Sequence, residues 1–256
     1  MTKIVTWNVN GIRARGKQVE ELVGTVSPDV LCLQEIKATA EQVEEDVCYL
    51  PELANHWHGA KGGYSGVSIH VRRKLGKASF VAPAPLDRET RVAVAEIETA
   101  SGPLTVASVY APNGGKDYDA KIAFYNDFVE WAAALAATGS PFVIVGDLNI
   151  AHTDEDVHPS QRKTGLIGQL PEERALFTRL LERGGLIDAA RLLHPDADRL
   201  FTWWPYWANA RKNNVGWRLD YVLVSKALNG RVKEADVLRE FGTSDHAPFY
   251  VDLDWP

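Results

Sequence analysis

The stretch Phe142-Val143-Ile144-Val145-Gly146-Asp147-Leu148-Asn149 places a carboxylate and a carboxamide directly after a run of apolar residues. A second stretch, Ser244-Asp245-His246-Ala247-Pro248, stands just before another apolar run, from Phe249 to Leu253. A strand that ends in such groups can present them at the rim of a sheet without burying their charge. Carboxylate oxygens and an acid–imidazole pair suit a hard metal ion and a polarised water. Together the two stretches predict a chemically active rim.

Short apolar runs of this kind recur along the chain and alternate with amphipathic, helix-like spacing. The expected strands are Ile4–Trp7, Val30–Leu33, Gly66–Val71, Val92–Ile97, Leu104–Val109, Phe142–Val145, Leu219–Val224 and Phe249–Leu253. Helices are expected at 19–26, 43–50 and 118–138, and from Pro171 to the stop at Gly184-Gly185. Because Ser101-Gly102-Pro103 predicts a hairpin between two of the strands, we expect an α+β layered sandwich rather than a purely parallel sheet.

The composition is that of an ordinary globular protein. Of the 256 residues, 45% are hydrophobic and 24% are charged, and no linker interrupts the chain, so we expect a single domain over 1–256. The two cysteines, Cys32 and Cys48, lie in apolar runs, which predicts buried thiols, no disulfide and a reducing compartment. The chain passes from Met1 almost directly into a strand, and no apolar run approaches the roughly 20 residues of a membrane helix. We therefore expect no signal peptide, no membrane and a cytoplasmic location, at the nucleoid if the source is bacterial.

The net charge is −6, which weighs against a nucleic-acid partner when the chain is taken as a whole. Residues 199–219, however, hold no acidic side chain and carry four of the eight tryptophans. Cations interleaved with aromatic rings suit a surface that holds phosphates and packs beside bases or sugars. The alternative is a tryptophan-rich core segment with solvated cations, and the composition of the segment fits both. The cations and aromatics are Arg199, Arg211, Lys212, Arg218, Phe201, Trp203, Trp204, Tyr206, Trp207 and Trp217.

Polar groups stand at the ends of the expected strands in every part of the chain. Taken singly, each has an ordinary explanation: Asn8 can form a turn before Gly11, and Glu35 can be a solvated acid at the start of a loop. Asp220 lies among apolar strand residues and needs a partner, for which His246 is the obvious candidate. One chemistry uses them all, because carboxylates bind Mg²⁺ or Mn²⁺, a histidine held by an aspartate meets a phosphate or a nucleophile, and a tyrosine assists a departing oxygen. The groups are Asn8, Asn10, Gln34, Glu35, Tyr110, Asp147, Asn149, Asp220, Asp245 and His246.

Five ordered blocks carry a family resemblance. They are Thr6-Trp7-Asn8-Val9-Asn10-Gly11-Ile12-Arg13, Leu33-Gln34-Glu35-Ile36-Lys37, Gly146-Asp147-Leu148-Asn149-Ile150-Ala151-His152, Gly216-Trp217-Arg218-Leu219-Asp220-Tyr221 and Ser244-Asp245-His246-Ala247-Pro248. In this order they resemble the exonuclease III family of apurinic/apyrimidinic endonucleases, within the endonuclease/exonuclease/phosphatase superfamily. The Glu35 block and the Ser-Asp-His-x-Pro block alone would indicate only the superfamily. The 211–217 stretch and the helix that begins at Pro171 narrow the resemblance to the DNA-repair branch.

The resemblance implies a fold and an activity. The fold is a DNase I-like, four-layer α/β/β/α sandwich with two packed mixed sheets. The activity is hydrolysis of DNA phosphodiesters with Mg²⁺, for which Mn²⁺ can substitute. The expected substrate is double-stranded DNA with abasic sites, cut on their 5′ side, or with blocked 3′ ends; 3′-to-5′ exonuclease activity of variable strength accompanies it. The expected protein is a monomer.

The resemblance also implies roles for individual residues. Glu35 would be the principal metal ligand, Asp147 would position or deprotonate the attacking water, and Tyr110 would assist the leaving 3′ oxygen. His246, held by Asp220, would contact the scissile phosphate, and either Asp147 or His246 could be the base. The implied metal set is Asn8, Glu35, Asp147, Asn149, Asp245 and His246, and the implied catalytic set is Tyr110, Asp147, Asn149, Asp220 and His246. The implied DNA contacts are Lys61, Tyr64, Asn113, Arg211, Lys212, Trp203, Trp217 and Leu219, of which Trp203, Trp217 and Leu219 would form an apolar pocket for a flipped abasic sugar.

Two other functions share part of this sequence pattern. A phosphoesterase of the same superfamily acting on lipids or inositol phosphates would need a lipid-facing surface, and the 199–219 segment counts against it. A catalytically silent DNA-binding relative would be expected to have lost some of the polar strand ends, yet all of them are present.

Overall fold

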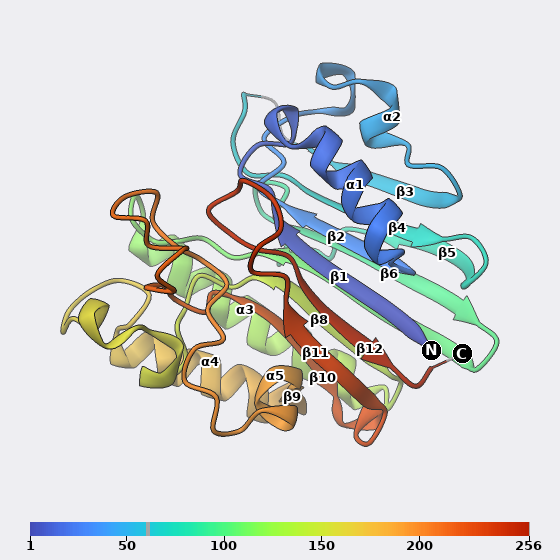
Figure 1. The fold of residues 1–256 in the computed structure, drawn as a ribbon. Coiled ribbons are helices and arrows are strands. Elements are labelled where there is room, and N and C mark those ends of the chain that lie inside the picture. Colours follow the sequence, from blue (N-terminus) through green and yellow to red (C-terminus); the bar gives the residue numbers. More distant parts are fainter. Residues whose placement is uncertain (60–61, 256) are drawn as a thin grey trace.

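The computed structural model of the chain describes residues 1–59 and 62–255, except for the side chains of Asp46 and Cys48. Strands of this part of the chain form two six-stranded sheets that pack face to face (Figure 1). The first sheet has the order β11 (Val232–Val237), β12 (Phe249–Leu253), β1 (Thr2–Asn8), β2 (Val30–Gln34), β4 (Val67–Arg72) and β3 (Leu53–His58). The second has the order β5 (Gly76–Val81), β6 (Val92–Thr99), β7 (Gly102–Tyr110), β8 (Phe142–Asp147), β10 (Asp220–Ser225) and β9 (Leu186–Asp188).

Both sheets are mixed, and each has one parallel pair near its centre. β1 pairs with β2 in parallel, and β7 pairs with β8 in parallel, whereas the other pairs are antiparallel. Parallel neighbours need a crossover connection. α1 (Gly16–Val26) lies in the first crossover and α3 (Tyr118–Ala137) in the second. The two halves of the molecule therefore repeat one local arrangement.

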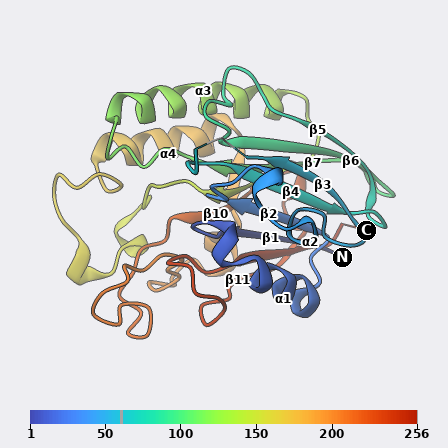
Figure 2. The same cartoon turned by 90° about the horizontal axis from the view of Figure 1, so that it is seen from above.

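The helices cover the outer faces of the sheets. Figure 2 shows α3 and α4 (Pro171–Arg183) on one side of the strands and α1 on the other. Three apolar layers result: one between the sheets, one between the second sheet and α3 with α4, and one between the first sheet and α1. Phe128 and Phe177 fill the second layer, and Trp7 and Leu22 fill the third. The expected four-layer, DNase I-like α/β/β/α sandwich is thereby confirmed.

Smaller features differ from the pattern expected in the sequence. The helix expected at 43–50 is a 3₁₀ turn, Ala40–Gln42, followed by the short α2 (Glu45–Cys48). A further short helix, α5 (Ala189–Leu193), follows β9 and is capped by Asp188, whose side chain accepts from the backbone N–H groups of Ala190 and Arg191. Cys32 is a free, fully buried thiol in β2, whereas the side chain of Cys48 lies outside the described residues. Within the described ranges, no helix is both long and apolar enough to cross a membrane.

The topology brings the polar strand ends to one edge of the sandwich. In the first sheet, Asn8 at the end of β1 lies opposite Gln34 at the end of β2. In the second sheet, Asp147 at the end of β8 pairs with Tyr110 on one side and with Asp220 on the other. Because the two sheets pack face to face, these ends meet at a common rim.

Candidate active site

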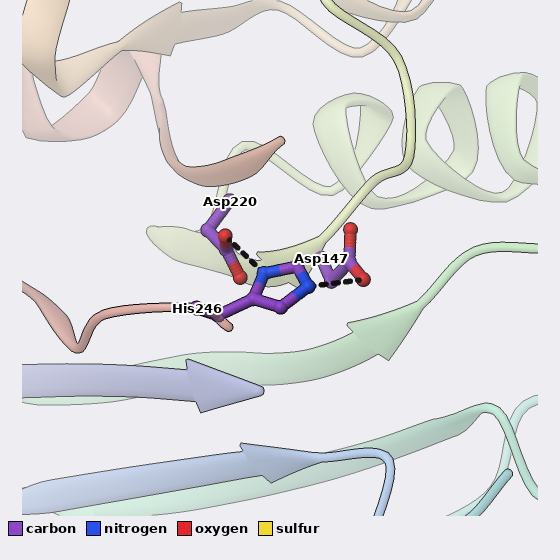
Figure 3. A group of neighbouring side chains, drawn as sticks. All are labelled: Asp147, Asp220 and His246. Atoms are coloured by element: carbon purple, nitrogen blue, oxygen red, sulfur yellow. Dashed lines mark hydrogen bonds and ion pairs between the residues drawn. The ribbon is translucent and has the colours of Figure 1, made fainter. Parts of the chain in front are cut away.

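The centre of the rim is a histidine between two aspartates (Figure 3). Asp147 ends β8, Asp220 begins β10, and His246 lies in the loop before β12. The Nδ1 atom of His246 is 2.8 Å from Oδ2 of Asp220, and its Nε2 atom is 3.8 Å from Oδ2 of Asp147 (Figure 3). The partner expected for Asp220 is therefore present, and the Nε2 edge of the imidazole faces Asp147.

Burial and charge perturb this trio strongly. Burial opposes a charge on His246, but Asp220 and Asp147 together raise the pKa of the imidazole to about 10. Burial raises the pKa of the Asp147 carboxyl to about 7, against the opposing effect of His246. The two groups titrate as a coupled pair, and perturbed pKa values of this size are typical of functional sites.

The loop of His246 is fixed from the first sheet. The indole N–H of Trp7 donates to the backbone oxygen of His246 at 3.1 Å. The hydroxyl of Ser244 donates to the backbone oxygen of Asn8 at 2.8 Å. Side chains and main chain of β1 thus hold a loop whose histidine reaches the second sheet.

Two amides hold Asp147. The side chain of Asn8 donates to its Oδ2 atom at 2.9 Å, across the gap between the sheets. Asn149 donates to Oδ1 through its backbone N–H at 3.0 Å and to Oδ2 through its side chain at 3.1 Å. The residue before Asp147 must be glycine, because a Cβ at Gly146, where φ is +138°, would lie 1.9 Å from the backbone oxygen of Val109. The Gly-Asp-x-Asn sequence therefore encodes both the close approach of β8 to β7 and the orientation of the carboxylate.

Two further carboxylates face the same cleft. Glu35, after β2, forms an ion pair with Lys37 at 2.9 Å. Asp245 accepts from Asn10 at 2.8 Å and from the indole N–H of Trp203 at 3.1 Å. The Nζ atom of Lys37 also donates to the side-chain oxygen of Asn10 at 2.7 Å, which links the two carboxylates through one network.

The donor set fits a hard metal ion. The ligand atoms of Asp147, Asp220 and His246 all lie within 4.8 Å of one another, and Glu35 and Asp245 add carboxylates to the same cleft. One oxygen of Asp220, Oδ1, is buried without a hydrogen-bond partner among the described residues. Several acids crowded into one cleft repel one another unless a cation offsets their charge. The site can therefore bind a metal.

The cleft contains several residues in the left-handed region of backbone conformation. Four of its lining residues have positive φ although they are not glycines: Asn10 (44°), Glu35 (55°), Lys37 (54°) and Asn149 (52°). Such conformations cost of order 1–3 kcal/mol each and persist where the surrounding structure holds them, commonly at functional sites. The strained positions coincide with polar residues that follow strand ends.

One side of the cleft is apolar. Trp203, Trp217 and Leu219 line it, and the two indole rings meet edge to face with centroids 5.7 Å apart. The whole cleft has a volume of about 420 Å³ and holds ten of the residues expected from the sequence. These ten are Glu35, Tyr110, Asn113, Asp147, Asn149, Trp203, Trp217, Leu219, Asp245 and His246.

The 199–219 segment contains both core and surface residues. Trp204 is buried, with 1% of its surface exposed, whereas Trp207 is 70% exposed. Arg211 donates to the backbone oxygens of residues 239, 241, 242 and 244, so it holds that loop. Lys212 is exposed. The core interpretation thus applies to Trp204, whereas Trp203 and Trp217 face the cleft.

Tyr110 and Tyr64 share a cation that the sequence did not single out. The guanidinium of Arg91 lies 5.0 Å from the ring centroid of Tyr110 and 5.3 Å from that of Tyr64, and it donates to the Tyr64 hydroxyl at 2.7 Å. Burial, followed by Glu35 and Asp147, raises the pKa of Tyr110 well above its ordinary value of 10. Tyr110 therefore stays protonated at neutral pH. Lys61 lies outside the described residues.

Two packed sheets with carboxylates and an imidazole at one rim define a class of phosphoester hydrolases. The model of the Endonuclease/Exonuclease/phosphatase family matches residues 5–246, and the chain belongs to this family. It is 35% identical to the DNA repair nuclease APEX1 of Danio rerio over 98% of this chain and 82% of that protein, and 32% identical to the exodeoxyribonuclease of Bacillus subtilis over 96% and 97%. It is also 35% identical to Recombination repair protein 1 of Drosophila melanogaster, of which it spans only 36%.

Solved structures agree with these relatives. The 3′ phosphatase NExo from Neisseria, bound to a product DNA hairpin, superposes with a TM-score of 0.88 at 28% identity and full coverage of both chains. An AP endonuclease from Archaeoglobus fulgidus superposes with a TM-score of 0.87 at 27% identity, over 99% of this chain and 100% of that chain. The chain is thus a hydrolase in the DNA-repair nuclease branch of its family.

Proposed function

We propose that this protein hydrolyses the phosphodiester on the 5′ side of abasic sites in duplex DNA, removes blocking groups from 3′ ends, and uses Mg²⁺. It acts as a single catalytic domain and as a monomer. One observation carries the proposal: a single cleft combines hydrolytic groups, Asp147 and His246, with an apolar wall at Trp203, Trp217 and Leu219. An apolar wall accepts a sugar that lacks its base, and the hydrolytic groups lie beside it.

The trio at the rim would activate the water. Asp220 occupies Nδ1 of His246, so Nε2 is directed toward Asp147 and the cleft. The coupled pair Asp147 and His246 takes the proton of the attacking water and contacts the scissile phosphate. Asn149 orients the water or the phosphate, since its amide is already held beside Asp147. Tyr110 donates its proton to the leaving 3′ oxygen.

The metal would be held by Glu35, with Asn8, Asp147, Asn149, Asp245 and His246 as the surrounding set. When bound, Mg²⁺ supplies positive charge that stabilises the charge developing on the phosphate. All these residues offer oxygen or imidazole donors, which suit Mg²⁺ or Mn²⁺.

The DNA would lie across the rim. Asn113 lines the cleft, and Tyr64 lines the hollow beside it. Lys212 lines another hollow, which shares Asp245 with the cleft, and the exposed Trp207 stands on the same loop as Lys212. Arg211 is a DNA contact predicted from the sequence, but its guanidinium donates to four backbone oxygens. We therefore infer that Lys212, rather than Arg211, is the main contact to a DNA phosphate.

An Asp147→Asn variant tests the proposal. The change keeps the size of the side chain and one of its two acceptor oxygens but removes its charge and basicity. Turnover on a duplex with one tetrahydrofuran abasic analogue should fall by at least ~10²-fold, as loss of a general base typically causes. The melting temperature should remain close to that of the wild type. Near wild-type turnover of this variant would exclude the mechanism.

A further inference from the structure

A buried ion pair lies behind the cleft, outside the set of residues that line it. Lys121 on α3 and Glu173 on α4 form it, with Nζ and Oε1 2.5 Å apart, and both side chains are fully buried. Burying two charges is costly, and such a pair is weak evidence of a contribution to stability. The other contacts of the two side chains, rather than the ion pair itself, indicate its function.

Each partner of the pair reaches loops that line the cleft. Lys121 donates to the backbone oxygen of Asn149 at 2.8 Å and to that of Asn113 at 3.3 Å. The carboxylate of Glu173 accepts from the backbone N–H groups of Gly168 at 2.6 Å and of Leu170 at 3.0 Å. Together with the ion pair, the two loop contacts use all three donors of the ammonium group.

The contact with Asn149 falls on a residue in the left-handed region. Asn149 has a φ of +52°, a conformation that is uncommon for a residue with a Cβ, although asparagine adopts it more readily than most. Its backbone N–H and side chain both donate to Asp147, so a rotation of this peptide would move the groups that orient the carboxylate. The bond from Lys121 to the backbone oxygen of Asn149 opposes that rotation.

We propose that Lys121 is a positioning residue for hydrolysis, which holds Asn149 and Asn113 in place, and that Glu173 supplies its counter-charge. The inference rests on the proposed role of Asp147 and Asn149 in cleavage. Lys121 touches neither substrate nor metal, and it acts through the backbone of the two loops. A displacement of about 1 Å at a reacting group can lower the rate by about 10²-fold, so loss of this support should reduce turnover.

The test uses the double variant Lys121→Met/Glu173→Gln in the full chain. It removes both charges, so no unpaired charge remains buried, and the amide oxygen of the new glutamine can still accept from Gly168 and Leu170. The ion pair itself and the two bonds from Lys121 to the loops are lost. The matched control is Arg183→Met/Glu130→Gln, which removes an ion pair between the same two helices, with Nη1 and Oε1 2.6 Å apart, on exposed side chains.

Turnover and KM on the abasic duplex are measured with the melting temperature of each protein. We expect kcat of Lys121→Met/Glu173→Gln to fall about 10- to 100-fold with KM nearly unchanged, at a temperature where the protein is folded, while the control keeps wild-type kcat. If this variant does not fold, Lys121→Gln/Glu173→Gln replaces it, because two glutamines can hydrogen-bond to each other. The glutamine side chain at position 121 is shorter than that of lysine and cannot reach the backbone oxygens of both Asn149 and Asn113. The same fall in kcat is therefore expected. Wild-type kcat in the folded variant, or an equal loss in the control, would overturn the inference. Failure of the wild type to cut this duplex would instead overturn the proposed function.

Discussion

Trp217 and Trp204 lie in the same segment, yet the structure predicts different effects when each is replaced by alanine. Trp204 is 1% exposed, its N–H donates to Asn214, and the guanidinium of Arg211 lies 5.1 Å from its ring centroid. Truncation of a buried tryptophan costs about 3–5 kcal/mol. For a chain of this size, each kcal/mol lowers the melting temperature by about 2–4 °C, so Trp204→Ala should lose roughly 6–20 °C.

Trp217 is half-buried and its ring faces the cleft, so its truncation removes fewer contacts. It loses a hydrogen bond to Gln161, worth about 0.5–1.5 kcal/mol, and the edge-to-face contact with Trp203, worth a similar amount. The expected loss is therefore about 1–3 kcal/mol, with a fall in kcat/KM on the abasic duplex of at least about 10-fold. Thermal unfolding and a gel-based incision assay on both variants check this. The pocket assignment is refuted if Trp217→Ala loses as much stability as Trp204→Ala, or if it cuts abasic duplex like the wild type.

Further predictions concern the metal, the histidine and the buried charges. Glu35→Gln should raise the Mg²⁺ concentration for half-maximal activity by about 10-fold or more without lowering the melting temperature, which a Mg²⁺ titration would measure. Asp220→Asn should reduce turnover less than His246→Asn, because Asp220 only orients the imidazole; a larger loss in Asp220→Asn would contradict that order. Asp156→Met should destabilise the protein by about 3–5 kcal/mol in denaturant unfolding, because it leaves the buried Arg218 with one carboxylate fewer. Burial opposes the charge on Asp156, but Arg218 and Arg191 lower its pKa from 3.8 to about 2, so this stabilisation is fully present above about pH 5 and is lost as the pH falls toward 2. Over that pH range, the free energy of unfolding of the wild type should therefore fall more steeply than that of Asp156→Met.

The strands that the sequence predicted and those that it did not predict occupy different positions in the sheets. All eight expected strands are interior, whereas β3, β5, β9 and β11 are the edges of the two sheets. An interior strand is covered on both faces and is therefore an apolar run, as in β2, where every residue is buried. An edge strand carries exposed and charged residues, such as Lys233 and Glu234 in β11, which also protect it from pairing with other chains. Apolar patterning thus identifies the core of a sheet and not its borders.

The site shows a similar division. Residues that follow strand ends were found because polar groups stand out after apolar runs, and the structure brings seven of them into one cleft: Asn10, Glu35, Tyr110, Asp147, Asn149, Asp245 and His246. Lys37, Arg91 and Lys121 were missed. Lys37 and Arg91 look in sequence like ordinary solvated cations, and Lys121 sits on the apolar face of α3, where it pairs with a residue on another helix. The contacts of these three residues depend on long-range packing, which leaves no local pattern in the sequence. The one indication was that Lys121 is an ionisable residue on an otherwise buried helix face.

The most direct test is incision of a duplex that carries one tetrahydrofuran abasic analogue, resolved on a sequencing gel beside an intact duplex of the same sequence. An inositol phosphate is assayed in parallel for release of phosphate. With Mg²⁺ present, we expect one cut on the 5′ side of the analogue, leaving a 3′-hydroxyl. We expect no cut in EDTA, recovery with Mg²⁺ or Mn²⁺, and no release of phosphate from the inositol substrate. Full incision after exhaustive chelation, or hydrolysis of the inositol phosphate without incision of the DNA, would contradict the proposed function.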